Sequence, residues 1–324
     1  MWLFWLLVVA ITIKVFNKLT SGKCYADTVM SGKVVVVTGA SGGIGFETAL
    51  ELARRGAKVI IACRSHQKGE RAVRIISKIA KNKRVRYIHL DLTSLASIRK
   101  FCDELKATEA KLDVLINNAG AFCTKRQRTP DGLLKDEQIN YFGPFLLTIL
   151  LVPMLKRVAS SRVVLVSSAW HKLGRIERVN DENAGYIQAY ATSKLCNILF
   201  CKELARRLKG TGVVVNSLNP GQVNTSLYRS VTVLEKLRSL VLYFFFKTPS
   251  EGAQTSVYLA VSDECDMVSG RYFEDCKEVM PSSKTEDEDT ASQLWAMSEE
   301  LVGLQPDELA HVTNSKGMVS GECN

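Results

Sequence analysis

Residues 34–45 read Val-Val-Val-Val-Thr-Gly-Ala-Ser-Gly-Gly-Ile-Gly, and a helical pattern follows from Phe46 to Arg55. The four valines form a short apolar run that is typical of a strand buried on both faces of a parallel sheet. The glycines allow a tight turn, and the N-terminus of the next helix offers free N–H groups to a pyrophosphate. Strand, glycine loop and helix in this order predict a dinucleotide-binding loop; a merely flexible glycine turn is the alternative. The loop lacks Gly-Lys-Ser/Thr, which argues against a nucleoside-triphosphate site.

The next apolar run, Lys58–Ala62, predicts a second strand that leads into Cys63 and Arg64. NAD-binding sites usually carry an acidic residue near this point, where it binds the 2′-hydroxyl of the ribose. Here Cys63 stands where the acid is expected, and the guanidinium of Arg64 suits a 2′-phosphate. The sequence therefore favours NADP over NAD, unless Arg64 is only a solvated loop residue.

Tyr190 and Lys194 are four residues apart in the segment Gln-Ala-Tyr-Ala-Thr-Ser-Lys, residues 188–194. On a helix, two such positions share one face. A cation beside a phenol favours the phenolate and lowers the pKa of the phenol from its ordinary value near ~10. Such pairs occur by chance on many surface helices, so this one predicts an acid or base only in combination with the dinucleotide loop.

Seven motifs follow one another along the chain: TGxxxGIG at 38–45, Ala-Cys-Arg at 62–64, Asp-Leu-Thr-Ser at 91–94, Asn-Asn-Ala-Gly at 117–120, Val-Ser-Ser at 166–168, the Tyr190/Lys194 pair and Asn-Pro-Gly at 219–221. In this order the chain resembles a short-chain dehydrogenase/reductase from Lys33 to about Gly303. Tyr-Phe-Glu-Asp-Cys at 272–276 and Leu-Trp-Ala-Met-Ser-Glu at 294–299 are similar to segments of the microsomal retinol dehydrogenases. The resemblance implies an α/β fold with a Rossmann-type, doubly wound parallel sheet in one domain.

The same resemblance implies four catalytic residues. Tyr190 would be the general acid/base, and Lys194 would lower its pKa and bind the nicotinamide ribose. Ser168 would hold the substrate oxygen, although a serine that only caps the end of a strand is the alternative. Asn140 would support a water that relays protons to Lys194, or else is simply the asparagine of a helix kink. Pro144 stands where the subfamily commonly has histidine, and we expect it to reshape that helix locally.

The implied cofactor site takes residues from most of the chain. Asp91 and Asn118 would line the adenine side, and residues 220–225 would surround the nicotinamide. The full set is Gly39, Ser41, Gly43, Ile44, Gly45, Arg64, Asp91, Leu92, Asn118, Ala119, Gly120, Tyr190, Lys194, Pro220, Gly221, Val223 and Thr225.

The N-terminal residues 1–13 are apolar apart from Thr12 and uncharged, and Lys14, Lys18 and Lys23 follow them. A helix needs about 20 apolar residues to span a bilayer, so an extension to Phe16 with a snorkelling Lys14 makes a marginal span. There is no basic segment before it and no small-x-small cleavage site, which favours a signal anchor or a monotopic insertion over a cleaved signal peptide. The lysine bias predicts a cytosolic catalytic domain, with a luminal orientation as the alternative.

A second apolar stretch, residues 240–246, reads Leu-Val-Leu-Tyr-Phe-Phe-Phe. The resemblance implies a substrate lid in this region, about residues 226–248. The stretch is either buried core or part of that lid, which would line a lipophilic substrate channel and touch the membrane. A capping-box pattern at Thr248, Pro249 and Glu251 then predicts the start of a helix.

Composition fits one catalytic domain, residues 32–304, between an anchor at 1–22 and a polar tail at 305–324 that we expect to be disordered from His311. Nine cysteines without CxxC spacing and four unclustered histidines argue against a disulfide framework and a metal site, and for a reducing compartment. The net charge of +10 is spread over helical segments such as 68–83 and 202–209, without interleaved aromatics, so we expect no nucleic-acid partner. The acidic run 286–289 predicts an exposed loop before a short helix around Trp295.

Together with the resemblance, these patterns predict an NADP(H)-dependent oxidoreductase that interconverts a lipophilic alcohol and its aldehyde or ketone. The resemblance and the apolar lid imply retinol/retinal as the leading substrate. The same chemistry on steroid, isoprenoid or lipid-derived carbonyls is an alternative, as is a catalytically idle scaffold or a structural protein that uses its apolar segment to bind partners. We expect the enzyme at the endoplasmic reticulum membrane or a lipid droplet, with a homodimer as a possible assembly.

Overall fold

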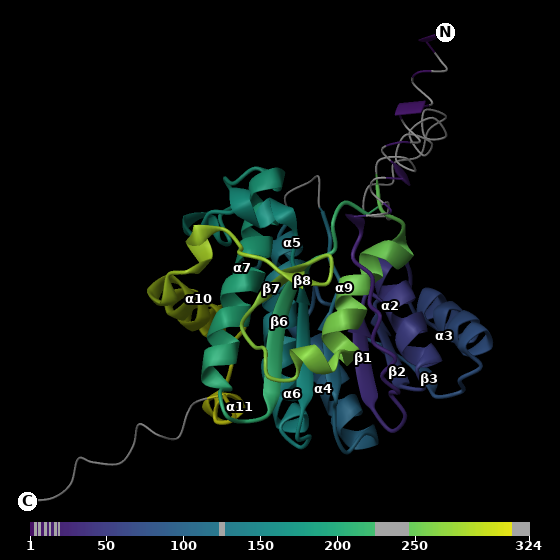
Figure 1. Cartoon of the computed structure of the whole chain (residues 1–324). Coiled ribbons are helices and arrows are strands. Elements are labelled where there is room, and N and C mark those ends of the chain that lie inside the picture. Colours follow the sequence, from purple (N-terminus) through teal and green to yellow (C-terminus); the bar gives the residue numbers. More distant parts are fainter. Residues whose placement is uncertain are drawn as a thin grey trace, which may run out of the picture.

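The computed structural model describes residues 20–122, 127–223 and 246–312, together with residues 1, 2, 5, 8, 9, 12, 14, 15 and 18. Within these residues one sheet has the strand order β3-β2-β1-β4-β5-β6-β7-β8 (Figure 1). The strands are β1 (Val34–Thr38), β2 (Lys58–Cys63), β3 (Val85–His89), β4 (Val114–Asn117), β5 (Ser161–Val166), β6 (Val213–Asn219), β7 (Tyr272–Glu274) and β8 (Lys277–Glu278). Neighbouring strands are parallel up to β7, and β8 pairs with β7 antiparallel.

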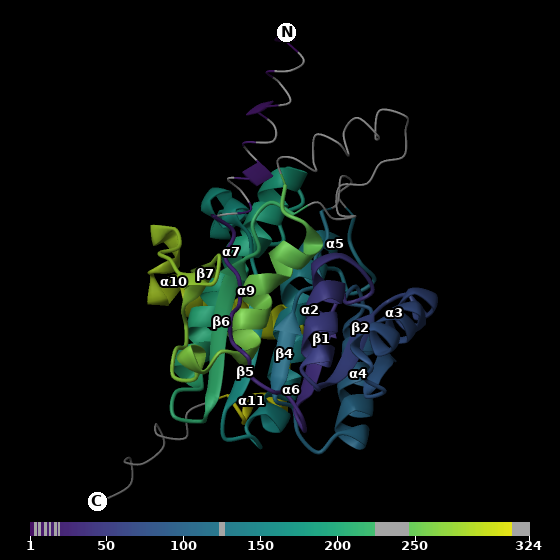
Figure 2. The ribbon, with the colours of Figure 1, turned by 45° about the vertical axis from the view of Figure 1, so that its right-hand side comes forward.

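Helices cover both faces of this sheet. They are α2 (Gly43–Arg54), α3 (His66–Ala80), α4 (Leu95–Thr108), α5 (Lys135–Glu137), α6 (Gly143–Leu155), α7 (Tyr186–Arg207), α9 (Pro249–Val261), α10 (Glu288–Leu301) and α11 (Pro306–Leu309). Figure 2 shows α2 and α9 in front of the sheet. The predicted Rossmann-type, doubly wound sheet is therefore confirmed.

The β1 valines show why this strand needs apolar residues at every position. Val35 and Val37 belong to the core beneath α2, α3 and α9, whereas Val34 and Val36 belong to the opposite core beneath α4, α6, α7 and α10. Successive side chains of a strand point to opposite faces, so a strand covered on both sides is apolar throughout. β1 pairs with β2 on one side and β4 on the other, and the crevice at this reversal of direction is where α/β sheets bind ligands.

The most apolar helical stretch is part of the core. Residues Lys135–Leu155 are long and apolar enough to cross a membrane, and no other helix among the described residues is, but 89% of the apolar window is buried inside the protein. This stretch packs under the sheet and is a core helix.

The C-terminal region differs from its prediction. The acidic run 286–289 is exposed as predicted, but only its first half precedes the helix: Asp287 caps α10, and Glu288 and Asp289 begin its 14 residues. Acidic side chains stabilise a helix N-terminus because their negative charge is attracted by the positive end of the helix dipole. Beyond it, α11 is tied to α4 by an ion pair between Glu308 and Arg99, and Val312 is buried.

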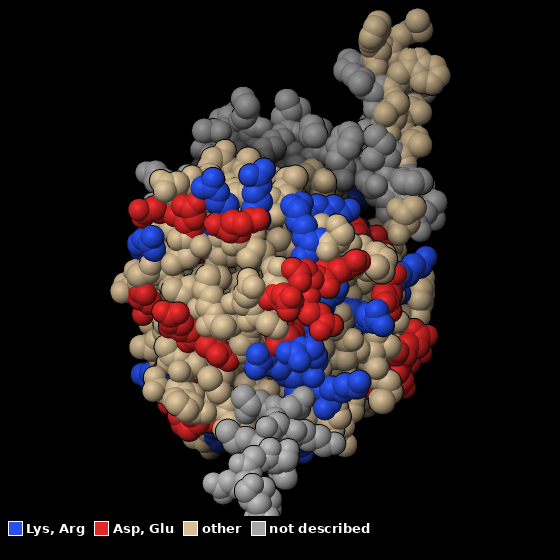
Figure 3. All heavy atoms as spheres, turned by 90° about the vertical axis from the view of Figure 1, so that its left-hand side faces the viewer, with Lys and Arg blue, Asp and Glu red and all other residues tan. Residues whose placement is uncertain are grey.

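Positive and negative side chains lie next to one another on the face drawn in Figure 3. On α7, the buried Glu203 pairs with Arg206 at 2.7 Å and with Arg207 at 2.6 Å. Arg207 also lies 4.1 Å above the ring of Trp295, which packs against Phe145 and Phe200. Arg206 and Arg207, two of the basic residues of α7, therefore make contacts that stabilise the fold.

Candidate active site

The glycine loop forms one wall of a cavity of about 410 Å³ at the carboxyl ends of the strands. Helix α2 begins at Gly43, three residues before the predicted start, so Gly43 and Gly45 belong to its first turn. Its N-cap, Gly42, has no capping side chain, which leaves N–H groups of the first turn available to an anion. A Cβ at Gly45 would lie only 2.3 Å from Nδ2 of Asn118. This cradle of bare backbone fits a dinucleotide pyrophosphate.

Tyr190 and Lys194 reach the same cavity from α7. The Nζ atom of Lys194 lies 5.6 Å from the centre of the Tyr190 ring and donates a hydrogen bond to the carbonyl of Val166 at 3.0 Å. Lys194 is only 4% exposed, and this burial lowers its pKa to about 8. The ammonium therefore remains mostly charged at neutral pH, and a cation at this position favours the phenolate of Tyr190.

Ser168 lines the cavity directly after β5. Its hydroxyl oxygen accepts a hydrogen bond from the backbone N–H of Trp170 at 3.3 Å and so caps a short 3₁₀ helix, Ala169–Leu173. The capping alternative for this serine is thus present in the structure. It does not compete with the substrate role, because a hydroxyl that accepts one bond still has a donor and a second lone pair to offer.

Asn140 lies beside the cavity, in a π-helical turn, Gln138–Phe142, that precedes α6. The carbonyl of residue 140 would accept from the N–H of residue 144 in an α-helix, but Pro144 has none, so the proline explains the widened turn. Nδ2 of Asn197 donates to that carbonyl at 3.0 Å. The Asn140 side chain is bonded to both backbone groups of Ala121 and to Ser193. The expected local reshaping by Pro144 is present, and the proton relay stays a prediction.

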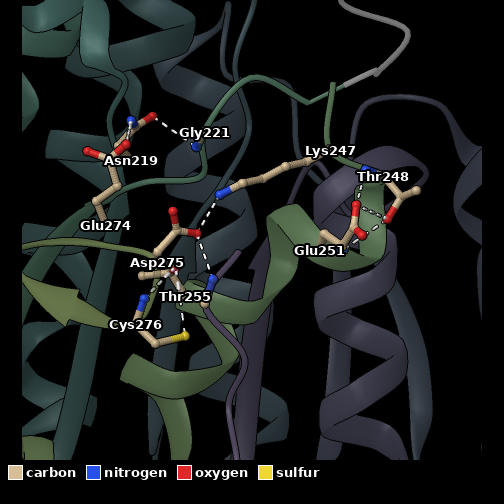
Figure 4. A network of polar contacts seen from close by, with 10 residues as sticks. Asn219, Gly221, Lys247, Thr248, Glu251, Thr255, Glu274, Asp275 and Cys276 are labelled. Atoms are coloured by element: carbon tan, nitrogen blue, oxygen red, sulfur yellow. Dashed lines mark hydrogen bonds and ion pairs between the residues drawn. The ribbon is translucent and has the colours of Figure 1, made fainter. Parts of the chain in front are cut away.

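The loop after β6 is held by side chains on both sides (Figure 4). Oδ1 of Asn219 accepts from the N–H of Gly221 at 3.1 Å, and its Nδ2 donates to Glu274 at 3.1 Å. Lys247 pairs with Asp275 at 2.5 Å. The predicted capping box at the start of α9 is present (Figure 4). Of the predicted nicotinamide-side residues, Pro220, Gly221 and Val223 line the cavity; Thr225, like most of the predicted lid and the stretch 240–245, lies outside the described residues.

Arg64 and Asp91, predicted for the adenosine side, lie at the ends of β2 and β3, beyond the cavity, whereas Asn118 lines the cavity directly after β4. Arg64 is exposed after β2, and Cys63 is buried beside Ser41, where burial raises the pKa of its thiol. Asp91 follows β3, and its carboxylate accepts from the backbone and hydroxyl of Thr93 at 2.9 and 2.7 Å. Ser41, Arg64, Asp91 and Leu92 therefore do not line the cavity, although the parallel strands bring all four to the same edge of the sheet.

Aromatic side chains surround the phenol of Tyr190. The ring centre of Phe122 lies 5.2 Å from that of Tyr190, 5.7 Å from Tyr186 and 6.1 Å from Trp170, and Trp170 lies 6.0 Å from Tyr190. All four contacts are edge-to-face, the geometry that aromatic quadrupoles favour. Tyr186 is 45% exposed, so the group reaches from the protein surface to the phenol of Tyr190.

A model of the short chain dehydrogenase family matches residues 33–235. The chain belongs to this family. It is 44% identical over 300 residues to retinol dehydrogenase 11 of Mus musculus, covering 92% of this chain and 95% of the relative. It is 46% identical to retinol dehydrogenase 14 of Homo sapiens, with 85% and 88% covered. A solved structure of an uncharacterised protein from Mycobacterium paratuberculosis matches 88% of this chain and 98% of its own at 34% identity and a TM-score of 0.71.

This short-chain dehydrogenase therefore places most of its sequence-predicted site residues around one cavity. Sequence reasoning missed Phe122, Trp170, Tyr186 and Glu274. Tyr186 could have been found, because it lies four residues before Tyr190 on the same helix. Trp170 could also have been found, because it lies two residues after Ser168. Phe122 lies two residues after Gly120 and Glu274 lies in the segment 272–276, but only the packing of distant segments shows that their side chains reach the site.

Proposed function

We propose that this short-chain dehydrogenase interconverts a lipophilic alcohol and its aldehyde or ketone with NADP(H), and that retinol/retinal is its leading substrate. The cluster of aromatic side chains around Tyr190 is the observation that supports a lipophilic substrate. Phe122, Trp170 and Tyr186 offer apolar ring surface beside the hydroxyls of Tyr190 and Ser168, which suits a long unsaturated chain that ends in one oxygen. The two retinol dehydrogenases named above support the choice of retinoid.

In this proposal Tyr190 exchanges a proton with the substrate oxygen. The charge of Lys194 favours the ionised phenol, and Ser168 offers a hydroxyl that orients the oxygen toward Tyr190. The nicotinamide cofactor, when bound, supplies or accepts the hydride. The uncapped N-terminus of α2 and the bare backbone at Gly45 would hold its pyrophosphate.

The preference for NADP rests on charge at the end of β2. Arg64 is exposed there and offers a guanidinium to a 2′-phosphate. Cys63 occupies the place of the usual acid, and the raised pKa of its buried thiol keeps it neutral at pH 7. No carboxylate at this position would then repel the phosphate.

We also propose that the N-terminal segment, residues 1–22, binds a membrane and leaves the catalytic domain in the cytosol, at the endoplasmic reticulum or a lipid droplet. Residues 2, 5, 8, 9, 12, 14, 15, 18 and 20 of this segment are helical, and Trp2 and Trp5 are 87% and 63% exposed. Lys14 donates to the carbonyl of Phe246 at 3.4 Å, and the N–H of Gly22 donates to Asp275 at 2.9 Å. These contacts put the segment next to the loops at the carboxyl edge of the sheet, where a lipophilic substrate would enter.

The test is an NADPH-consumption screen of the purified full-length chain in detergent, with retinoid, steroid, isoprenoid and alkyl aldehydes. We expect the highest kcat/KM with retinal. Tyr190→Phe, which keeps the ring and removes the hydroxyl, should lower kcat by about 10²–10⁴ with little change in NADPH affinity. Equal turnover by wild type and Tyr190→Phe would contradict the acid/base role. If the enzyme prefers a steroid or alkyl aldehyde, that compound class replaces retinal as the proposed substrate. If none of the aldehydes is reduced, the protein is better explained as a catalytically idle scaffold.

A further inference from the structure

His171 is fully buried, three residues after Ser168, and bonds to it twice. The backbone N–H of His171 donates to the carbonyl of Ser168 at 3.0 Å. The Nδ1 atom of its ring lies 2.8 Å from the same carbonyl. On the other side of the ring, the backbone N–H of Ser282 lies 3.1 Å from Nε2.

These contacts select one tautomer of the imidazole. A backbone N–H can only donate, so Nε2 must accept from Ser282 and carries no proton. The proton of the neutral ring is therefore on Nδ1, where it donates to Ser168. A protonated ring would place N–H against N–H at Ser282, so the arrangement requires a neutral histidine. Burial, together with the charges of Lys172 and Lys284, lowers the pKa of His171 in the same direction.

The groups packed around His171 come from three parts of the chain. Tyr272 on β7 stacks edge-to-face on the ring at 5.1 Å, and its hydroxyl lies 3.5 Å from Nδ1. Lys284 donates to the carbonyls of Lys172 and Gly174 at 3.1 and 2.9 Å. The 3₁₀ helix that Ser168 caps is thus bonded at three points to residues 282–284, which are more than 100 positions away in the sequence.

We propose that His171 is a positioning residue: it bonds the main chain of Ser168 to the C-terminal segment 282–285 and so sets the place of the Ser168 hydroxyl. This inference rests on the proposed function, in which that hydroxyl orients the substrate oxygen. The C-terminal segment, which does not line the cavity, then contributes to catalysis through one imidazole.

Two amide variants separate the two bonds of the ring. His171→Asn places an N–H donor near the position of Nδ1 and keeps the bond to Ser168, whereas His171→Gln places an oxygen near Nε2 and keeps only the bond to Ser282. Each variant breaks the link between Ser168 and Ser282, so with NADPH and retinal we expect kcat about tenfold lower in both, at unchanged NADPH affinity. A kcat within about threefold of wild type in either variant, or a loss of NADPH affinity in step with kcat, would overturn the proposal.

A double-mutant cycle asks whether His171 acts through Ser168. In a Ser168→Ala background, His171→Gln should change kcat by less than about twofold, because the positioned hydroxyl is already absent. Fully additive losses would indicate a general structural role and overturn the proposal.

NMR spectroscopy tests the tautomer of His171 without relying on turnover. ¹⁵N-histidine labelling gives two ring-nitrogen signals for each of the four imidazoles, and the His171→Asn variant assigns the pair from His171. We expect the neutral Nδ1–H tautomer from about pH 6 to 8. The Nε2–H tautomer or a protonated ring at pH 7 would overturn the proposal, whereas failure of the wild type to reduce retinal with a correct tautomer would count against the proposed substrate alone.

Discussion

Replacement of Lys194 by methionine should change how the stability of the protein depends on pH. Burial lowers the pKa of Lys194 from 10.5 to about 8. Each pKa unit corresponds to about 1.4 kcal/mol, so the charged lysine costs the cofactor-free protein roughly 3 kcal/mol of unfolding free energy at pH 7. Methionine has a similar length and no charge, and it removes this cost together with the hydrogen bond to Val166.

Proton linkage determines whether the wild type gains or loses stability as the pH rises. Because the folded-state pKa is lowered, the unfolded chain binds more protons than the folded chain between about pH 8 and 10.5, and the cost disappears as the pH rises through this window. Between pH 7 and 9 the wild type should therefore gain about 1 kcal/mol relative to Lys194→Met. The lost hydrogen bond and the altered packing do not titrate, so they cancel in this comparison.

The assay is urea unfolding of cofactor-free protein, followed by circular dichroism at pH 7 and pH 9. Lys209→Met, at an exposed position just after the same helix, controls for the loss of one positive charge. A gap between wild type and Lys194→Met that stays constant, or that moves in favour of the variant at pH 9, would refute the reasoning. Lys194→Met should also lose turnover, so the same lysine would be shown to lower stability and to support activity.

Arg64→Asp should weaken NADPH binding by about tenfold to a hundredfold and NADH binding much less, and equal effects on both would remove the basis for the NADP preference. Gly45→Ala should destabilise the cofactor-free protein by about 1–3 kcal/mol, because its Cβ would lie 2.3 Å from Nδ2 of Asn118. Gly42→Ala is the matched control, since nothing lies within 4 Å of its Cβ; urea midpoints that do not differ between the two would contradict the close approach. Trp295→Ala should cost about 3–5 kcal/mol in the same assay, and a change below 1 kcal/mol would mean that α10 is not part of the core.

Local sequence patterns predicted the structure correctly wherever the residues that interact are close in sequence. The four valines of β1 predicted a doubly buried strand because both faces of a parallel sheet select apolar side chains. The capping box at Thr248 and Glu251 was correct because its hydrogen bonds join residues within one helical turn. The extent of α10 was wrong because the acidic run resembles a solvated loop, and its role as an N-terminal turn depends on Trp295 packing against distant helices.

The sequence by itself determined the sheet, the glycine loop and the chemical identity of Tyr190, Lys194 and Ser168, because each depends on a residue type at a short, fixed spacing. Tertiary structure alone decided which side chains enclose them. Phe122 comes from the loop after β4 and Trp170 from the turn after β5, and they meet Tyr190 only because neighbouring parallel strands end at one edge. The tautomer of His171 likewise depends on an N–H from residue 282, and no local pattern predicts which backbone group a buried imidazole will meet.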